Sequence, residues 1–150
     1  FIFLKVSSKE TAEDLSSEVF ERVWKNYQKT HIENVQAFLY QVARNVIADH
    51  YRKNSKAKVI FTEVEIEVED AADSPEEQAI AAMDIERIQV ALSSLNDAYQ
   101  DYIIWKYIEE LTVPEIALIL DKTPESVRVG THRALVALKK AIDQKSEAKV

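Results

Sequence analysis

The scarcity of glycine constrains this fold more than any other feature of the sequence. The 150 residues include one Gly and three Pro. Turn-rich β architectures depend on both residue types, so a chain with so few of them is expected to be mostly helical. The hydrophobic fraction of 47% is enough for a core and argues against wholesale disorder. We predict an all-α protein: two small helical domains joined by an acidic linker.

The first domain, residues 1–58, shows apolar positions at helical spacing. Thr11 and Asp14 form a capping-box-like start to the first long helix. A loop over 26–34 follows, and then a second helix from about Asn34 to Lys53. The predicted inward residues are Leu15, Val19 and Val23, widened by Phe20, Trp24 and Tyr27, and in the second helix Val35, Leu39, Val42 and Val46. Because the sequence opens on the apolar stretch FIFLKV and not on Met, we expect the N-terminal part of this domain to be incomplete.

Negative charge is concentrated in the middle of the chain. Residues 1–58 carry ten basic and seven acidic side chains, residues 59–90 carry one and ten, and residues 91–150 carry eight and nine. The three balances of +3, −9 and −1 give the net charge of −7. Both flanks can therefore approach an anion, whereas the middle repels one.

Residues 59–75 are interpreted as the acidic linker. Val64, Ile66 and Val68 alternate with glutamates, which is strand periodicity, but a single strand without a partner is not stable. An extended, solvated linker is the first interpretation, and a strand that docks on a partner is the alternative. Fully extended, such a segment reaches about 55–60 Å, more than the ~34 Å of one DNA turn.

The second domain, residues 76–150, carries clear helix signals. Ser74 and Pro75 are expected to start a helix that runs to about Leu92, and Asn96 is expected to cap the next. Ile85, Ile88 and Leu92 are predicted to face inward in the first of these helices, and the second contains Tyr102, Ile103 and Tyr107.

Two further helices have the spacing of a helix-turn-helix. Thr112 and Glu115 form a capping box before a short apolar helix, and Asp121 can adopt the left-handed conformation that a tight turn needs. Thr123 and Pro124 then begin a long cationic helix. A short helix, a tight turn and a longer basic helix are typical of DNA-binding domains.

The last helix separates an apolar face from a basic one. Val127, Thr131, Leu135, Leu138 and Ile142 are predicted to face inward, and Arg128, Val129, His132 and Arg133 to face outward. Arginine can engage guanine in bidentate fashion, and Lys139 and the helix N-terminus can hold phosphates. The alternative is an ordinary amphipathic helix with a solvated charged face.

Three stretches of the chain resemble one protein family. AEDLSSEVFERVW and AFLYQVARNVIADHYRK are similar to parts of region 2 of the extracytoplasmic-function (ECF) sigma factors of bacterial RNA polymerase, and LTVPEIALILDKTPESVRVGTHRALVAL is similar to region 4. The resemblance covers nearly the whole chain in the family's order. It implies a sigma factor that binds core RNA polymerase, recognises −35 duplex DNA, and melts and recognises the −10 element.

The resemblance also implies roles for individual residues. The predicted polymerase-binding residues are Asp14, Leu15, Ser17, Glu18 and Arg22, with Ser17 standing where the family usually has Gln. The predicted −10 residues are Asn26, Tyr27, Lys29, His31 and Asn34 in the loop, where a flipped base would be captured, and Tyr40, Arg44, Tyr51, Arg52 and Lys53 on the second helix. The predicted −35 residues are Thr123, Ser126, Arg128, Val129, His132, Arg133 and Lys139. Phe38 is assigned to the core.

Gly130 departs from the family pattern, which often has a larger side chain there. Glycine inside a helix costs about 1 kcal/mol relative to alanine. Two interpretations stay open at this point: close approach of the backbone to DNA, or no specific role.

The implied partners are core RNA polymerase, promoter DNA and an anti-sigma factor, in the bacterial cytoplasm. No cofactor, metal site, membrane insertion or enzymatic activity is expected, since the chain has no Cys, no Gly-rich phosphate loop and no apolar run near the roughly 18 residues of a membrane span. Two alternatives are a stand-alone helix-turn-helix regulator, which leaves AEDLSSEVFERVW unexplained, and a helical protein-binding adaptor, which leaves Arg128, His132 and Arg133 without a role.

Overall fold

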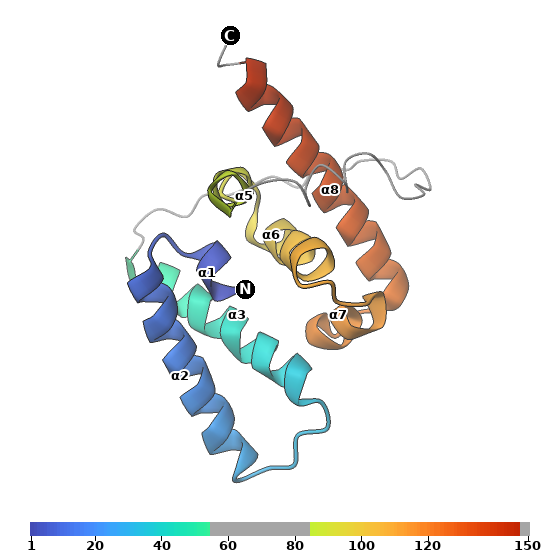
Figure 1. Ribbon diagram of the computed structural model, residues 1–150. Coiled ribbons are helices and arrows are strands. Elements are labelled where there is room, and N and C mark those ends of the chain that lie inside the picture. The colour runs from blue at the N-terminus through green and yellow to red at the C-terminus, as the bar shows by residue number, and fades with distance from the viewer. Residues whose placement is uncertain (55–84, 148–150) are drawn as a thin grey trace.

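The computed structural model describes residues 1–54 and 85–147, and within each range the chain forms helices joined by short connections (Figure 1). The N-terminal half contains α1 (Ile2–Lys5), α2 (Lys9–Tyr27) and α3 (Val35–Asn54). The C-terminal half contains α5 (Ile85–Leu92), α6 (Asp97–Ile103), the π-helical η1 (Ile104–Ile108), α7 (Val113–Leu120) and α8 (Pro124–Glu147). The all-α prediction is confirmed. The predicted linker over 59–75 and the predicted helix start at Ser74 lie outside the described residues.

Helices α2 and α3 run antiparallel and share one apolar seam (Figure 1). The predicted residues Leu15, Val19 and Val23 of α2 are buried there against Val42, Val46 and Ile47 of α3, and Phe38 and Leu39 pack at the edge. The start of α2 differs from the prediction. Ser8, and not Thr11, is the N-cap, because the Ser8 side chain accepts a hydrogen bond from the backbone N–H of Thr11.

Three aromatic residues predicted to widen the α2 seam lie in solvent instead. Phe20, Trp24 and Tyr27 are 63%, 61% and 56% exposed. They lie beside the seam of Val19 and Val23, and α3 covers only that seam. Val35 and Ile85, also predicted to face inward, are exposed as well, since each lies at the first described turn of its helix.

The core of the C-terminal half surrounds η1. Trp105 and Ile104 are fully buried, and α8 packs on α6 and α7 over Val127, Ala134 and Leu138. The backbone N–H of Glu109 donates to the carbonyl of Ile104 at 2.9 Å, the five-residue spacing of a π-turn. The sequence predicts an ordinary helix here, because nothing in the apolar run YIIWKYI distinguishes α from π hydrogen bonding.

The predicted helix-turn-helix is present. Thr112 and Glu115 form a capping box at the start of α7, and Asp121 adopts the left-handed conformation, with φ 51° and ψ 48°. Thr123 accepts a hydrogen bond from the N–H of Ser126 at 3.2 Å and so caps α8. The inward face is as predicted: Val127, Thr131, Leu135 and Leu138 are buried, and Ile142 packs beside them.

The two halves pack directly on each other. Helix α3 lies against α7, and α1 lies against α5 and α3 (Figure 1). The Gln41 side chain donates to the carbonyl of Ile119 at 3.1 Å, and the Gln89 side chain donates to that of Phe3 at 3.0 Å. Ala37 of α3 belongs to the buried cluster of the C-terminal half. The apolar cluster of the C-terminal half therefore extends onto α3.

Gly130 is explained by packing inside the protein. A Cβ atom built at this position would lie 2.4 Å from Cζ and 2.6 Å from Cε2 of Tyr102, whose ring is 5% exposed. These separations are far below van der Waals contact. The single glycine of the chain therefore lets α8 approach α6 across the Tyr102 ring, and no approach to DNA is needed to account for it.

We expect Gly130→Ala to destabilise the fold by about 1–3 kcal/mol, the usual cost of overpacking. Helix propensity alone predicts the opposite sign, a gain of about 1 kcal/mol. Urea unfolding measures the effect of Gly130→Ala twice: once against the parent protein, and once against Tyr102→Leu. Truncation of the ring should relieve most of the clash; equal losses in both backgrounds would contradict the packing explanation.

Candidate nucleic-acid interface

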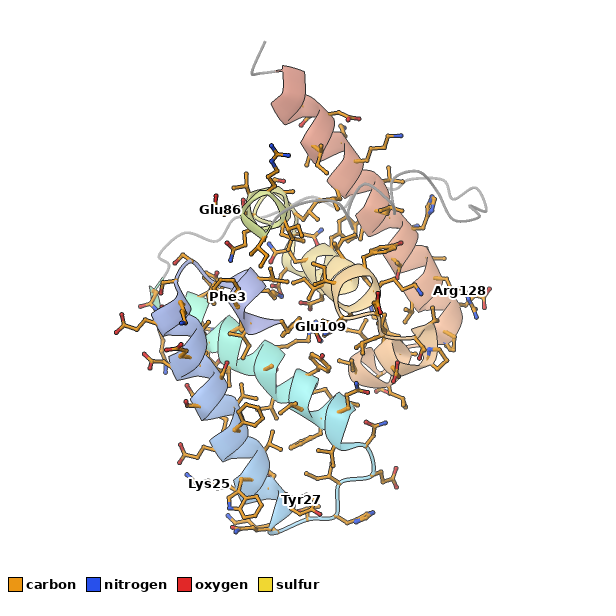
Figure 2. All side chains as sticks on the ribbon, viewed as in Figure 1. Phe3, Lys25, Tyr27, Glu86, Glu109 and Arg128 are labelled. Atoms are coloured by element: carbon orange, nitrogen blue, oxygen red, sulfur yellow. The ribbon has the colours of Figure 1, made fainter. Side chains whose placement is uncertain are left out.

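The N-terminal half of α8 presents the predicted −35 residues at the molecular surface. Figure 2 shows Arg128 at the outer edge of the helix, pointing away from the rest of the protein, and its guanidinium lies 3.2 Å from Glu125. Thr123 and Ser126 are exposed, and their hydroxyl oxygens lie 3.0 Å apart at the helix N-terminus. A pair of exposed hydroxyl groups at the positive end of a helix dipole suits a phosphate group.

The other predicted −35 residues differ in exposure. Val129, His132 and Arg133 are half-buried, and Lys139 is exposed three turns further along. The Nε atom of Arg133 is buried and has no hydrogen-bond partner among the described residues. Arg128 is therefore the most accessible of the predicted base-reading side chains.

The predicted base-capture loop encloses an open hollow. The hollow has a volume of about 440 Å³ and is lined by Tyr27, Gln28, Lys29, Thr30, His31, Ile32 and Val35. Tyr27 and Lys25 lie at the tip of α2 beside it (Figure 2). Asn26 and Asn34, at the two ends of the loop, instead form hydrogen bonds with the backbone. The Asn26 side chain donates to the carbonyl of Arg22, and the Asn34 side chain accepts from the N–H of Ala37. Three of the five predicted loop residues therefore line a hollow of suitable size for a base.

The C-terminal end of α3 carries exposed basic residues. Arg52 and Lys53 are exposed, and Arg52 lies 3.1 Å from Asp49. The Tyr51 hydroxyl donates to the backbone carbonyl of Lys5. Burial, followed by the nearby charge of Asp97, raises the pKa of this phenol. This end of α3 is open to solvent, although the hydroxyl of Tyr51 is committed to α1.

Tyr40 and Arg44, the remaining predicted −10 residues, face the C-terminal half of the protein. The Arg44 Nε atom donates to Asp101 of α6 at 2.8 Å, and the Arg44 guanidinium lies 5.9 Å from the ring centroid of Trp105. The Tyr40 hydroxyl donates to Glu109, which Figure 2 shows between the two halves. These contacts were not foreseen from the sequence, and they leave this part of α3 covered.

Asp101 is the centre of a buried ion cluster. Its side chain is 1% exposed, and it pairs with Lys5, which is 2% exposed, and with Arg44. Lys5 also lies 2.6 Å from Asp97, an exposed carboxylate. Burial raises the pKa of the Asp101 carboxyl, against the opposing effect of Lys5, and the charge of Asp97 raises it further. The cluster thus joins α1, α3 and α6, and the burial of Lys5 and Asp101 costs the free energy of removing two charges from water.

The predicted polymerase-binding residues lie along one side of α2. Asp14 and Ser17 are exposed, and Glu18 and Arg22 form an ion pair in which each side chain is 42% exposed. Leu15 is buried in the seam and supports this face from behind. The polar residues of the set are therefore available to a partner.

No group of three or more His, Cys, Asp or Glu in residues 1–54 and 85–147 could hold a metal ion. Within the same residues, no helix is both long enough and apolar enough to cross a bilayer.

Replacement of the buried carboxylate should cost far more stability than replacement of its exposed neighbour. We expect Asp101→Asn to lower the free energy of unfolding by about 3–5 kcal/mol, because Lys5 and Arg44 lose a buried counter-ion. Asp97→Asn, which removes the other acceptor of Lys5, should change it by less than about 1 kcal/mol. Urea unfolding of both variants tests the difference, and equal effects would contradict the central place given to Asp101.

Comparison with known proteins matches each half of the chain to a region of the sigma-70 family. Residues 3–57 match the model of sigma-70 region 2, and residues 85–138 match that of sigma-70 region 4. The chain is 31% identical over 140 residues to the ECF RNA polymerase sigma factor SigW of Bacillus subtilis, covering 87% of this chain and 75% of SigW. It is 27% identical over 143 residues to the ECF RNA polymerase sigma factor BldN of Streptomyces coelicolor, covering 92% of this chain and about half, 53%, of BldN.

Solved structures share the fold. The sigma factor RpoE of Bartonella quintana, in complex with the anti-sigma factor NepR, superposes with a TM-score of 0.66 at 18% identity, over 95% of this chain and 87% of that chain. CnrH in complex with the cytosolic domain of CnrY gives a TM-score of 0.65 at 18% identity, over 94% and 77%.

Proposed function

This chain belongs to the ECF sigma factors of RNA polymerase, and on that premise we propose that it binds the core enzyme and directs it to specific promoters. The observation that carries the proposal is the exposed Arg128 on the N-terminal half of α8, within a complete helix-turn-helix. The proposed role is that of a specificity subunit, which brings an enzyme to DNA and contributes no catalytic groups of its own. It places the protein in the bacterial cytoplasm, with the polymerase.

The proposed mechanism uses both halves. Arg128, with Val129, His132 and Arg133 beside it, reads the −35 duplex, while Thr123, Ser126 and Lys139 hold phosphates. The hollow at the tip of α2 takes a base flipped from the −10 element, and Tyr40, Arg44, Tyr51, Arg52 and Lys53 contact the melted strand. Asp14, Ser17, Glu18 and Arg22 contact the polymerase. Two weak sites on one chain strengthen each other through their high effective concentration.

We also propose an anti-sigma partner. The support is the fold, which is shared by the sigma factor RpoE in complex with the anti-sigma factor NepR and by CnrH in complex with the cytosolic domain of CnrY. The proposed domain boundaries are 1–58 and 76–150, with the acidic segment 59–75 between them.

The deciding experiment selects DNA from a random promoter pool with this protein, in the presence and in the absence of bacterial core RNA polymerase. A sigma factor enriches paired −35 and −10 elements only with core present. Tight, specific selection without core would favour the stand-alone helix-turn-helix regulator and would remove the polymerase-binding role of α2.

Arg128→Ala should weaken recognition of the selected −35 element by about 1–3 kcal/mol and relax base preference at one position. Lys139→Ala, the matched phosphate-contact variant, should weaken binding to all sequences alike and reduce its salt dependence. Holoenzyme binding to a panel of single-base promoter variants separates the two effects. An unchanged base preference in Arg128→Ala would remove that residue from the readers.

A further inference from the structure

We propose that a pocket between α1, α3, α5 and α6 binds a small amphiphilic amine, a molecule that carries an ammonium group on an aliphatic body. The pocket has a volume of about 860 Å³, within the roughly 300–1,000 Å³ of ordinary small-molecule sites. Of its described lining residues, only Tyr51 is also proposed to contact DNA or polymerase. The inference therefore goes beyond the proposed function and does not depend on it.

The lining of the pocket is mainly apolar. Its buried apolar residues are Val6, Ile47 and Leu95, and its more exposed ones are Leu4, Ala48 and Val90. The aliphatic body of a ligand that covers these side chains removes apolar area from water, which favours binding. A bare metal ion gains nothing from such a lining, because it requires several oxygen ligands around it.

The polar side chains of the lining are arranged to accept hydrogen bonds. Side chains that already donate to backbone carbonyls are Gln89 (to Phe3), Gln100 (to Leu95), Ser93 (to Val90) and Tyr51 (to Lys5). These side chains still offer a ligand mainly oxygen atoms, which are two amide oxygens and the lone pairs of two hydroxyl groups. Acceptor oxygens suit a ligand that donates N–H groups, as an ammonium group does.

The charges of the pocket also favour a cation. Lys5 is the one cationic side chain among the described lining residues; it is 2% exposed, and its ammonium already contacts Asp97 at 2.6 Å and the buried Asp101. The Asp97 side chain is 68% exposed and contacts Lys5 through Oδ1. Glu86 on α5 is a second exposed carboxylate of the lining (Figure 2). Charge complementarity therefore favours a cation in this pocket and opposes an anion.

Probes of equal carbon number test the proposal: hexylamine, hexanol and hexanoate, which are cationic, neutral and anionic at neutral pH. Each is titrated into the full 150-residue chain, and binding is followed by the NMR chemical shifts of the backbone amides that line the pocket. We expect hexylamine to shift these signals, hexanol to bind at least about tenfold more weakly, and hexanoate to leave them unchanged. No binding of hexylamine, or equal binding of hexylamine and hexanol, would overturn the proposal.

Removal of either carboxylate charge should weaken binding of the amine alone. We expect Glu86→Gln and Asp97→Asn each to bind hexylamine several-fold more weakly than the parent chain does, with hexanol binding unchanged. Glu110→Gln, a change of an exposed carboxylate outside the pocket, is the matched control and should leave both unchanged. An equal loss in Glu110→Gln would overturn the proposal, because the net negative charge of the chain would then attract the amine. Circular dichroism confirms that each variant is folded, and Glu86→Gln carries the test if Asp97→Asn is not.

A variant that fills the pocket locates the bound amine. Ala48 is exposed on α3 and lines the pocket, so Ala48→Phe should abolish the binding of hexylamine and of hexanol together. Hexylamine should also raise the unfolding temperature of the parent chain, because it binds the folded state, but not that of Ala48→Phe. Retained binding of hexylamine in Ala48→Phe would place the amine elsewhere and overturn the site. These measurements use neither polymerase nor DNA, so failure of the proposed function leaves their outcome unaffected.

Discussion

One buried carboxylate fixes how the two halves of this molecule meet. Asp101 on α6 is surrounded by protein and is paired with cations from two other helices, Lys5 of α1 and Arg44 of α3. A buried ion pair contributes little net free energy compared with apolar packing, but separating its charges is costly. The cluster therefore acts mainly on geometry: sliding of α1 or α6 would separate the buried charges of Lys5 and Asp101, and sliding of α3 would remove the second cation of Asp101. The neighbouring contacts of Tyr40 and Trp105 depend on that register.

The features that could be predicted from the sequence are those set within a few residues of each other. The capping box of Thr112 and Glu115, the cap at Asn96 and the left-handed Asp121 each depend on local hydrogen bonds or on a single residue's conformation. The spacing of Val127, Thr131 and Leu135 likewise predicts which face of α8 is buried. The outward direction of Arg128 is a consequence of that phase, and so the exposure of this proposed −35 residue could be predicted from the sequence.

The features that could not be predicted depend on which helix lies next to which. Lys5 and Asp101 are 96 positions apart, and no local pattern indicates that they meet. Trp24 and Tyr40 are both aromatic residues on amphipathic helices, yet α3 leaves the first exposed while the C-terminal half covers the second. The π-turn of η1 is likewise invisible in an apolar run. For the same reason the sequence suggested residues for a −10 face but not that two of them, Tyr40 and Arg44, contact the C-terminal half.

The contact between Gly130 and Tyr102 has an evolutionary consequence. Because the ring occupies the space of a Cβ atom at position 130, a side chain can appear there only if position 102 has first lost volume. The two positions are therefore expected to change as a pair along a lineage, ring with glycine or smaller residue with side chain. Such covariation would link α6 through packing to α8, the helix that is proposed to read DNA.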